Sequence, residues 1–258
     1  MKDFVTIISK DNPLIKLICS LQTSKKARKE EGIFVLEGLR ICLDAMENGI
    51  EFDKLIVSES AFEKYYEFIV NFEKISNKCY KVSDNLFCKI SDTESPQGII
   101  TVAKTPLNKS KIDKFGKYIA LENLQDPSNL GAITRTAEAL GVSGIILTSC
   151  CDPYSPKSLR SSMGTILRVP LFLTSNLISF IKENNLTSYG CVVQKDAKSI
   201  SDIKFDESSV LIIGNEANGI SPETQENSDY LITIPMKGRA ESLNAAVAAS
   251  ISMWEMMK

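Results

Sequence analysis

The sequence contains no histidine in 258 residues, and this absence excludes several kinds of active site. Catalytic pairs of serine or cysteine with histidine cannot form, and neither can any metal site that uses imidazole. The seven cysteines form no CxxC pair, so their spacing does not predict a zinc site made of four thiolates. Acid–base chemistry in this chain must therefore use Asp, Glu, Lys, Arg, Tyr or a bound water.

Long apolar runs are also missing from the sequence. No run approaches the roughly 18 residues that span a bilayer, and the N-terminal MKDFVTIISKDNPLIK lacks the basic and apolar regions of a signal peptide. With no export signal, the cysteines are expected to be reduced thiols and the protein is predicted to be cytoplasmic. A hydrophobic content of 43% and a charged content of 24% are ordinary for one large or two modest globular domains.

Charge is distributed unevenly along the chain. The net charge of −2 argues weakly against a nucleic-acid partner, yet residues 1–40 carry 8 Lys and Arg against 5 Asp and Glu. Residues 115–258 carry 12 against 15. The densest basic run, formed by Lys25, Lys26, Arg28 and Lys29, predicts a phosphate-binding patch. A solvated helix end is about equally compatible with this run.

The first 105 residues alternate between helix and strand patterns. Asn12 and Pro13 start a helix that runs to about Leu21, because Asn is a good N-cap and Pro favours the first turn. A basic turn follows it. Strands are then predicted at 33–36, 54–57, 80–82 and 98–102, with helices at 39–48 and 62–72. This alternation predicts a small three-layer α/β domain over residues 1–105. The lysine-rich stretch 106–114, with Pro106, is the predicted linker.

Residues 115–258 predict a second, larger α/β domain. Buried-type strands are expected at 118–121, 144–147, 190–193, 210–213 and 231–234, with helical patterns between them. Such a pattern indicates a parallel sheet with helices on both faces. Three segments at strand ends, 123–141, 211–221 and 234–251, carry glycine and polar residues where the chain leaves the sheet. Open α/β sheets bind ligands outside these ends, so the three loops are expected to converge on one crevice.

Each of the three segments also has a plain structural interpretation. In the first, Ser128 or Asn129 could simply cap a helix, and Arg135, which lies off the apolar stripe, could be a solvated arginine. The second contains GxxxxG, but Ile220 occupies the position where a phosphate-binding loop needs lysine. In the third, a stripe that includes Trp254 along an alanine-rich helix predicts either a dimer contact or a core helix.

In this order and spacing, the three segments resemble the signature motifs of the SpoU branch of the SPOUT RNA methyltransferases. The segment 155–170 is similar to the middle block of these enzymes, and the stretches 34–38 and 96–100 resemble their small ribosomal-protein-like RNA-binding domain. The resemblance implies transfer of a methyl group from S-adenosyl-L-methionine to a ribose 2′-oxygen of rRNA or tRNA. It also implies a homodimer, no metal, no membrane and a trefoil-knotted catalytic domain, with the knot within roughly 210–251, an exception to unknotted topology.

The resemblance also carries residue roles onto this sequence. Asn129 is expected to hold the ribose, and Arg135 to orient the hydroxyl and stabilise developing alkoxide, because guanidinium stays protonated and is a poor base. The full catalytic set is Asn129, Arg135, Glu216, Ser242 and Asn244. The expected cofactor-binding set is Gly214, Asn215, Glu216, Gly219, Ile234, Met236, Ser242 and Leu243. Arg160, in the middle block, joins Lys25, Lys26, Arg28 and Lys29 as an expected RNA-binding residue.

Two other functions compete with this interpretation. A non-catalytic RNA-binding or ribosome-assembly protein could keep the knotted fold, but the catalytic set is complete, which favours an enzyme. Base methylation on the same fold is a weaker alternative, and the Asn129–Arg135 pair of the first motif favours ribose. Ribosomal RNA is the expected substrate, with tRNA as the alternative.

Overall fold

The computed structural model describes residues 3–106, 111–194 and 196–258. The chain forms two compact units. The first unit comprises Met1–Leu107 and Tyr154–Arg160, and the second comprises Asn108–Pro153 and Ser161–Lys258. The domain boundaries predicted from the sequence assign residues 154–160 to the second domain, whereas in the structure this segment packs with the first unit. Residues 107–110 of the predicted linker lie outside the described residues.

The first unit is built on a mixed sheet with the strand order β1-β4-β3-β5-β2. Strands β1, β4 and β3 are parallel, and β5 runs antiparallel to β3 and β2. The strands are β1 (Val5–Ile7), β2 (Ile33–Glu37), β3 (Phe52–Ser58), β4 (Ser76–Val82) and β5 (Ile99–Lys104). The helices are α1 (Pro13–Thr23), α2 (Lys25–Glu31), α3 (Leu39–Glu47), α4 (Glu59–Lys64), α5 (Tyr66–Ile75) and α6 (Asp84–Ile90).

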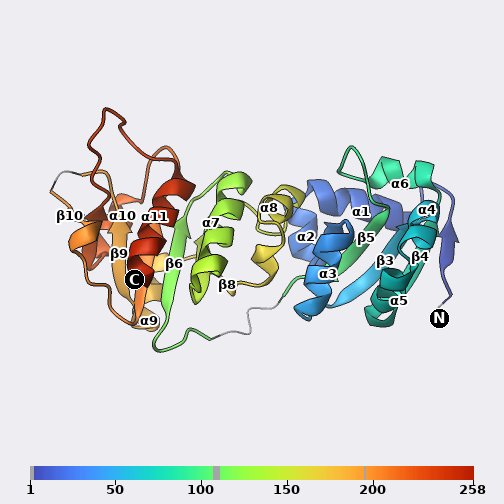
Figure 1. The fold of residues 1–258 in the computed structure, drawn as a ribbon, viewed down its shortest axis with the longest axis horizontal. Helices are drawn as coiled ribbons and strands as arrows, with labels where there is room; N and C mark the ends of the chain where they lie inside the picture. Colours follow the sequence, from blue (N-terminus) through green and yellow to red (C-terminus); the bar gives the residue numbers. More distant parts are fainter. Residues whose placement is uncertain (1–2, 107–110, 195) are drawn as a thin grey trace. The chain divides into compact units, whose positions relative to one another are not determined.

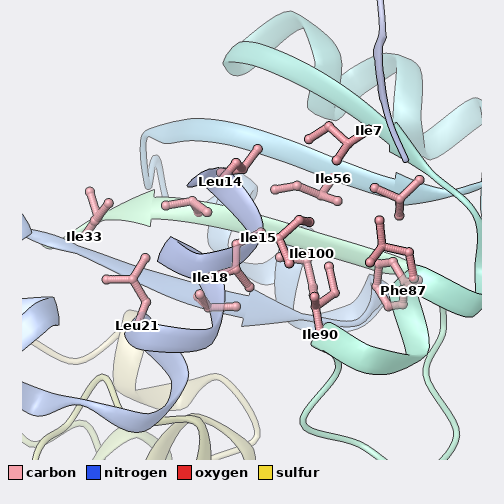
Figure 2. Packing of buried hydrophobic residues seen from close by; sticks show 14 residues of the cluster. Ile7, Leu14, Ile15, Ile18, Leu21, Ile33, Ile56, Phe87, Ile90 and Ile100 are labelled. Carbon is pink, nitrogen blue, oxygen red and sulfur yellow. The ribbon is translucent and has the colours of Figure 1, made fainter. Parts of the chain in front are cut away.

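Helices cover both faces of this sheet, which gives the three layers that the alternating pattern predicts. Figure 2 shows one core, in which Ile15 and Ile18 of α1 and Phe87 of α6 pack against sheet residues Ile56 and Ile100. On the other face α3 and α5 contact the sheet, where the rings of Phe52 and Phe72 lie 5.9 Å apart. The helix predicted at 62–72 is divided in the structure between α4 and α5.

The basic run at 25–29 forms helix α2 rather than the predicted turn. Ser24 accepts a hydrogen bond from the Ala27 N–H and caps this helix. Arg28 points inward and is only 6% exposed, and its guanidinium donates to the carbonyls of Leu21 and Gln22 in the last turn of α1. Carbonyls at a helix C-terminus lack intrahelical partners and attract cations. This corrects the expectation that Arg28 binds RNA, because its charge is used inside the first unit.

The second unit is built on a parallel sheet with the strand order β10-β12-β9-β11-β6-β7-β8. All its described strand pairs are parallel, as the sequence predicts. The strands are β6 (Lys117–Glu122), β7 (Gly144–Thr148), β8 (Leu171–Leu173), β9 (Thr187–Cys191), β10 (Lys198–Ser199), β11 (Ser209–Ile213) and β12 (Tyr230–Thr233). The helices are α7 (Pro127–Leu140), α8 (Pro156–Ser161, which begins in the first unit), η1 (Thr165–Leu167), α9 (Leu177–Glu183), η2 (Ile200–Asp202), α10 (Pro222–Asn227) and α11 (Ala245–Met257).

Two groups of helices cover the two faces of the parallel sheet. Helix α9 packs on the face formed by alternate residues such as Tyr118 and Ile212, and α10 contacts α9. Helices α7 and α11 pack side by side, as Figure 1 shows, and α11 contacts β6 and β11. Parallel crossovers are right-handed as a rule, so the helix of a crossover that moves one way along the sheet, such as α7, is expected on the opposite face from α9 and α10, whose crossovers move the other way.

The short edge strands β8 and β10 are not among the predicted elements. Runs of three and two residues are too short to show a strand pattern, so their pairing depends on the neighbouring strand. Strand β9 lies at Thr187–Cys191 rather than at 190–193. The trefoil knot around 210–251 stays a prediction. In the described part of the chain, no helix is both long enough and apolar enough to cross a membrane.

Candidate active site

Three loops that follow β6, β11 and β12 meet at the carboxyl edge of the parallel sheet. β11 pairs with β6 on one side and β9 on the other, and β12 pairs with β9. The first loop leads into α7, the second forms a tight turn at 214–221, and the third leads into α11. Parallel strands present their carboxyl ends at one edge, so these loops come together as the sequence predicts.

One polar side chain from each loop joins a hydrogen-bonded chain, which we call the Glu216–Asn129–Asn244 cluster. The amide Nδ2 of Asn129 donates to Oε1 of Glu216 at 3.0 Å. The Oδ1 of Asn129 accepts from Nδ2 of Asn244, also at 3.0 Å. Asn129 is 7% exposed, so its amide orientation is fixed by two partners in a largely buried position. Three residues predicted as catalytic are thus linked, with Asn129 bonded to both of the others.

Asn129 reaches this position because another residue caps its helix. Asp126 is the N-cap of α7, and its side chain accepts from the Ser128 N–H at 2.8 Å. Pro127 follows in the first turn, where its fixed φ suits a helix start. The sequence predicted Ser128 or Asn129 as the cap. With Asp126 in that role, Asn129 lies inside the first turn and its side chain is available to Glu216 and Asn244.

Asn244 combines a capping function with its contact to Asn129. Its Oδ1 accepts from the N–H groups of Ala246 at 2.9 Å and Val247 at 3.3 Å, which makes it the N-cap of α11. Its Nδ2 remains free to donate to Asn129. The start of α11 and the orientation of the Asn129 amide therefore depend on one side chain.

Glu216 is the anionic end of the cluster. Its carboxylate accepts from the backbone N–H groups of Asp126 at 3.0 Å and Gln125 at 3.2 Å, in addition to Asn129. Burial alone would raise the pKa of Glu216, but these hydrogen bonds outweigh it and hold the pKa below its ordinary value. Glu216 is therefore ionised at neutral pH and ties the second loop to the first.

A cavity of about 440 Å³ lies beside this cluster. Its lining includes all the residues predicted to bind the cofactor, namely Gly214, Asn215, Glu216, Gly219, Ile234, Met236, Ser242 and Leu243. It also includes residues 191–194, at the end of β9 and directly after it, which sequence reasoning missed. Those residues carry no glycine or charge pattern, and only the strand order reveals that β9 lies between β11 and β12.

Glycine is required at one wall of this cavity. A Cβ built on Gly214 would lie 2.0 Å from the backbone carbonyl carbon of Gly219, far inside contact distance. The N–H groups of Asn215 and Gly219 each donate to the other's carbonyl at 2.9 Å, which closes the turn. Gly219 has a φ of +67°, which suits glycine. The space beside Gly214 is therefore filled by the chain's own backbone, and a side chain at this position would break the turn that forms the cavity wall.

Arg135 and Ser242 stand apart from the hydrogen-bonded cluster. Arg135 is exposed on α7, and its side chain forms neither a hydrogen bond nor an ion pair within the described residues. It does not line the cavity. Ser242 lines the cavity and is exposed. The structure of a single chain thus brings together Asn129, Glu216 and Asn244, and leaves Arg135 on the surface.

The predicted RNA-binding residues lie in the first unit. Lys25, Lys26 and Lys29 are exposed on α2, and Lys26 forms a 3.7 Å ion pair with Glu30. Arg160, on α8, donates from its guanidinium to the carboxylate of Asp92 and remains half exposed. A surface ion pair of this kind contributes little to stability, so Arg160 can exchange Asp92 for another anion.

The fold and this site define an α/β enzyme domain that binds its ligand at the carboxyl edge of a parallel sheet, joined to a smaller α/β unit. A family model described as the SpoU rRNA Methylase family matches residues 116–254. A second, described as the MRM3-like substrate binding domain, matches residues 12–101. The chain belongs to the SpoU rRNA methylase family. The resemblance found in the three motifs is thereby confirmed.

Similar proteins cover almost the whole chain. An uncharacterized tRNA/rRNA methyltransferase from Synechocystis is 32% identical, over 98% of this chain and 93% of that protein. The 23S rRNA (guanosine(2553)-2′-O)-methyltransferase of Bacillus subtilis is also 32% identical, over 90% and 92%. Among solved structures, the AdoMet-bound rRNA methyltransferase from Sinorhizobium meliloti is 28% identical, with a TM-score of 0.85, covering 97% of this chain and 96% of the other.

Proposed function

We propose that this protein transfers a methyl group from S-adenosyl-L-methionine to a ribose 2′-hydroxyl of ribosomal RNA. The observation that carries the proposal is the Glu216–Asn129–Asn244 cluster, which joins the three motif loops beside a glycine-walled cavity. The B. subtilis relative, named for 2′-O-methylation of 23S rRNA, supports ribosomal RNA over tRNA as the substrate. Because this relative is bacterial, we expect the reaction to occur in the cytoplasm.

The lining of the cavity suits S-adenosyl-L-methionine. Its volume of about 440 Å³ falls in the range of small-molecule sites. Apolar side chains such as Ile234 and Leu243 line the cavity and can contact an adenine ring. Among the lining residues that the structure describes, the charged ones are the carboxylates Glu216 and Glu241. Negative groups favour the binding of a positively charged sulfonium.

The chain's own residues would position the ribose and stabilise charge. When bound, the cofactor supplies a methyl group that is already activated by the positive charge on sulfur. Asn129 keeps one N–H and one oxygen lone pair beyond its two hydrogen bonds, so it can hold a ribose hydroxyl. Glu216 is ionised but surrounded by donors, and its role is to fix Asn129. Arg135 would orient the 2′-hydroxyl and stabilise the developing alkoxide. We expect an RNA phosphate oxygen to take the proton.

We also propose that the protein works as a homodimer that pairs through α11. Val247, Ile251 and Trp254 are 46%, 37% and 57% exposed, so this face is not covered by the chain's own core. The face that packs inward carries small residues and methionines, among them Ala249 and Met253. A two-fold pairing would bury the exposed apolar face against its own copy. Arg135 lies on α7, the neighbour of α11, and would be near such an interface.

The first unit is proposed to select the RNA, and the second to supply the chemistry. The match of residues 12–101 to a substrate-binding domain supports this division. Lys25, Lys26 and Lys29 on α2, together with Arg160, are the proposed phosphate contacts. Residues 1–105 would form the substrate-binding domain and residues 115–258 the methyltransferase domain, with 106–114 between them.

Incubation of the protein with labelled S-adenosyl-L-methionine and total RNA tests the proposed function. The label should appear in 23S rRNA, and nuclease digestion should release a 2′-O-methylated nucleoside. Label in a base would contradict ribose methylation, and label in tRNA alone would contradict the choice of substrate. RNA binding without any transfer would support the non-catalytic alternative.

A further inference from the structure

A second cavity, of about 570 Å³, opens at the same edge of the parallel sheet. It lies at the carboxyl ends of β6 and β7 and at the start of α9, whereas the cofactor cavity lies around β9, β11 and β12. Asn215, Asn218, Gly219 and Ile220 line both cavities. The turn after β11 is therefore a common wall, with the proposed cofactor site on one side and the second cavity on the other.

The walls of the second cavity are polar but carry no positive charge. No lysine or arginine is among its described lining residues, so a phosphate group has no cation to pair with there. The acidic groups are Glu122 and Glu223, and the rest of the polar lining is amides and hydroxyls. Ile178 and Pro222 give it apolar surface. Such a lining suits a flat, uncharged ligand with hydrogen-bonding edges.

Several polar groups in this cavity have no partner in the described chain. The side chains of Ser149, Ser175, Asn218 and Glu223 form no hydrogen bond or ion pair there. Glu122 differs, because its carboxylate accepts from Ser221 N, Ser221 Oγ and Thr224 Oγ1 at 2.7–2.9 Å. Glu122 therefore holds the wall together, and Glu223 is the carboxylate that remains available to a ligand.

The mouth of the cavity contains two residues in an uncommon backbone conformation. Asn123 and Ser149 follow the paired ends of β6 and β7, and both have positive φ, +56° and +54°. Asn tolerates this region, but Ser adopts it at a cost. At these two residues the chain leaves β6 and β7, and both residues line the cavity. Such residues concentrate at functional sites.

We propose that the second cavity binds a guanine base of the substrate RNA, from an unpaired nucleotide that flanks the methylated ribose. The proposal rests on RNA being the substrate. Sequence-specific RNA recognition targets unpaired bases, whose edges are hydrogen-bonded and whose faces are stacked. Guanine presents neighbouring N1–H and N2–H donors, which match the free carboxylate of Glu223. The face of the base would contact Ile178. The shared wall at 215–220 would place this nucleotide beside the reacting one.

Nucleoside binding tests the proposal without requiring methyl transfer. Saturation-transfer NMR would measure guanosine, adenosine and uridine with full-length protein saturated by S-adenosylhomocysteine, so that the cofactor cavity cannot take a nucleoside. We expect guanosine to bind and uridine to bind at least about tenfold more weakly. Glu223→Gln should weaken guanosine about tenfold, and Ser175→Trp, which fills the cavity, should abolish its binding.

Two variants close in sequence to the test positions serve as matched controls. Ser179→Trp on α9 and Glu226→Gln on α10 are exposed and do not line either cavity, so guanosine binding should stay within twofold of wild type. The affinity for S-adenosylhomocysteine should be the same in all five proteins. Absence of guanosine binding, or equal binding in Ser175→Trp and wild type, would overturn the proposal. Labelling of RNA by the wild-type sample reports separately on the proposed methyl transfer.

Discussion

At the scale of single residues, Asn129 shows how a side chain acquires a role from its neighbours. Its amide is held by Glu216 on one side and Asn244 on the other, and all three belong to different loops. Sequence reasoning named these three residues from the motifs. It could not predict their order in the chain of hydrogen bonds, because the same pattern allowed Asn129 to be a plain N-cap. The capping by Asp126 decides between these alternatives.

Replacing Asn244 separates its two contributions. Asn244→Asp keeps the acceptor that caps α11 but removes the N–H that donates to Asn129, and it places a negative charge beside the amide oxygen of Asn129. We expect its thermal stability to stay close to wild type while methyl transfer falls by at least about tenfold. Asn244→Ala should lose both functions, with about 1 kcal/mol of stability lost with the cap. Thermal unfolding and turnover measured together check this, and equal turnover for Asp and Asn would contradict the role of the N–H.

Arg135→Ala tests the arginine that the single chain leaves on its surface. Methyl transfer should fall by roughly 10²–10³-fold, the usual cost of removing one donor to the transition state, and the affinity for S-adenosyl-L-methionine should be unchanged. Single-turnover kinetics and calorimetry measure the two quantities. Arg40→Ala, an exposed arginine on α3, is the control. A fall of less than about threefold would make Arg135 an ordinary surface residue.

Glu216 should make the free energy of unfolding decrease as the pH falls into the acidic range. Its pKa in the folded protein is lowered, so unfolding takes up a proton at mildly acidic pH. The stabilisation from the ionised carboxylate is therefore complete above its ordinary pKa and is lost as pH falls through the lower, folded-state pKa. Denaturant unfolding of wild type and Glu216→Gln between pH 7 and pH 3 should show a difference that is constant at neutral pH and shrinks in acid.

At the scale of elements, α11 presents two faces of different character. Ala249 and Met253 face the sheet, and Val247, Ile251 and Trp254 remain exposed. The sequence predicted the apolar stripe but left core and interface open, since periodicity identifies a face and not what covers it. The local sequence pattern also did not predict that Arg28 of α2 is buried. Its guanidinium donates to carbonyls at the end of α1, and this contact between two helices is not visible in the charge pattern of one segment.

Trp254 offers a direct measurement of the proposed dimer. It is the single tryptophan of the chain, and 57% of it is exposed in one protomer. Burial at a two-fold interface should shift its emission to shorter wavelength as protein concentration rises. Ile251→Lys should abolish this shift and give a monomer by light scattering, because an unpaired charge in an apolar interface is costly. Leu173→Lys, which changes an exposed residue on β8, should leave the dimer intact. A wild-type monomer at micromolar concentration would contradict the role of α11.

At the scale of the whole molecule, the parallel sheet and the crevice at its carboxyl edge followed from strand pattern and loop composition. Two features did not follow from the sequence, namely the edge strand β8 and the part played by the residues after β9 in lining the cavity. Both depend on the order of the strands in the sheet, which the sequence does not show. The count of charged residues located an excess of positive charge in the first 40 positions. Within the basic run at 25–29, the structure shows that the exposed cations are Lys25, Lys26 and Lys29.

Salt dependence tests whether these three lysines hold RNA. Replacing Lys25, Lys26 and Lys29 together with Ser, while Arg28 is kept for its structural role, should weaken RNA binding and leave the cofactor affinity unchanged. The slope of log affinity against log salt should become shallower by roughly 2, since each lost phosphate contact contributes about 0.7 on single-stranded RNA. Replacing Lys74, Lys78 and Lys198, exposed lysines elsewhere on the protein, is the control. Equal slopes would show that α2 is merely solvated.

The return of residues 154–160 to the first unit has a consequence for biosynthesis. On the ribosome, residues 1–107 emerge first, yet the segment that completes their unit appears only after β6, α7 and β7 have been made. At typical rates of synthesis this delay lasts several seconds. Until then the ring of Phe34, which packs against Tyr154 in the finished protein, lacks that contact. The nascent first unit should therefore be more sensitive to protease before residue 160 leaves the exit tunnel than after it.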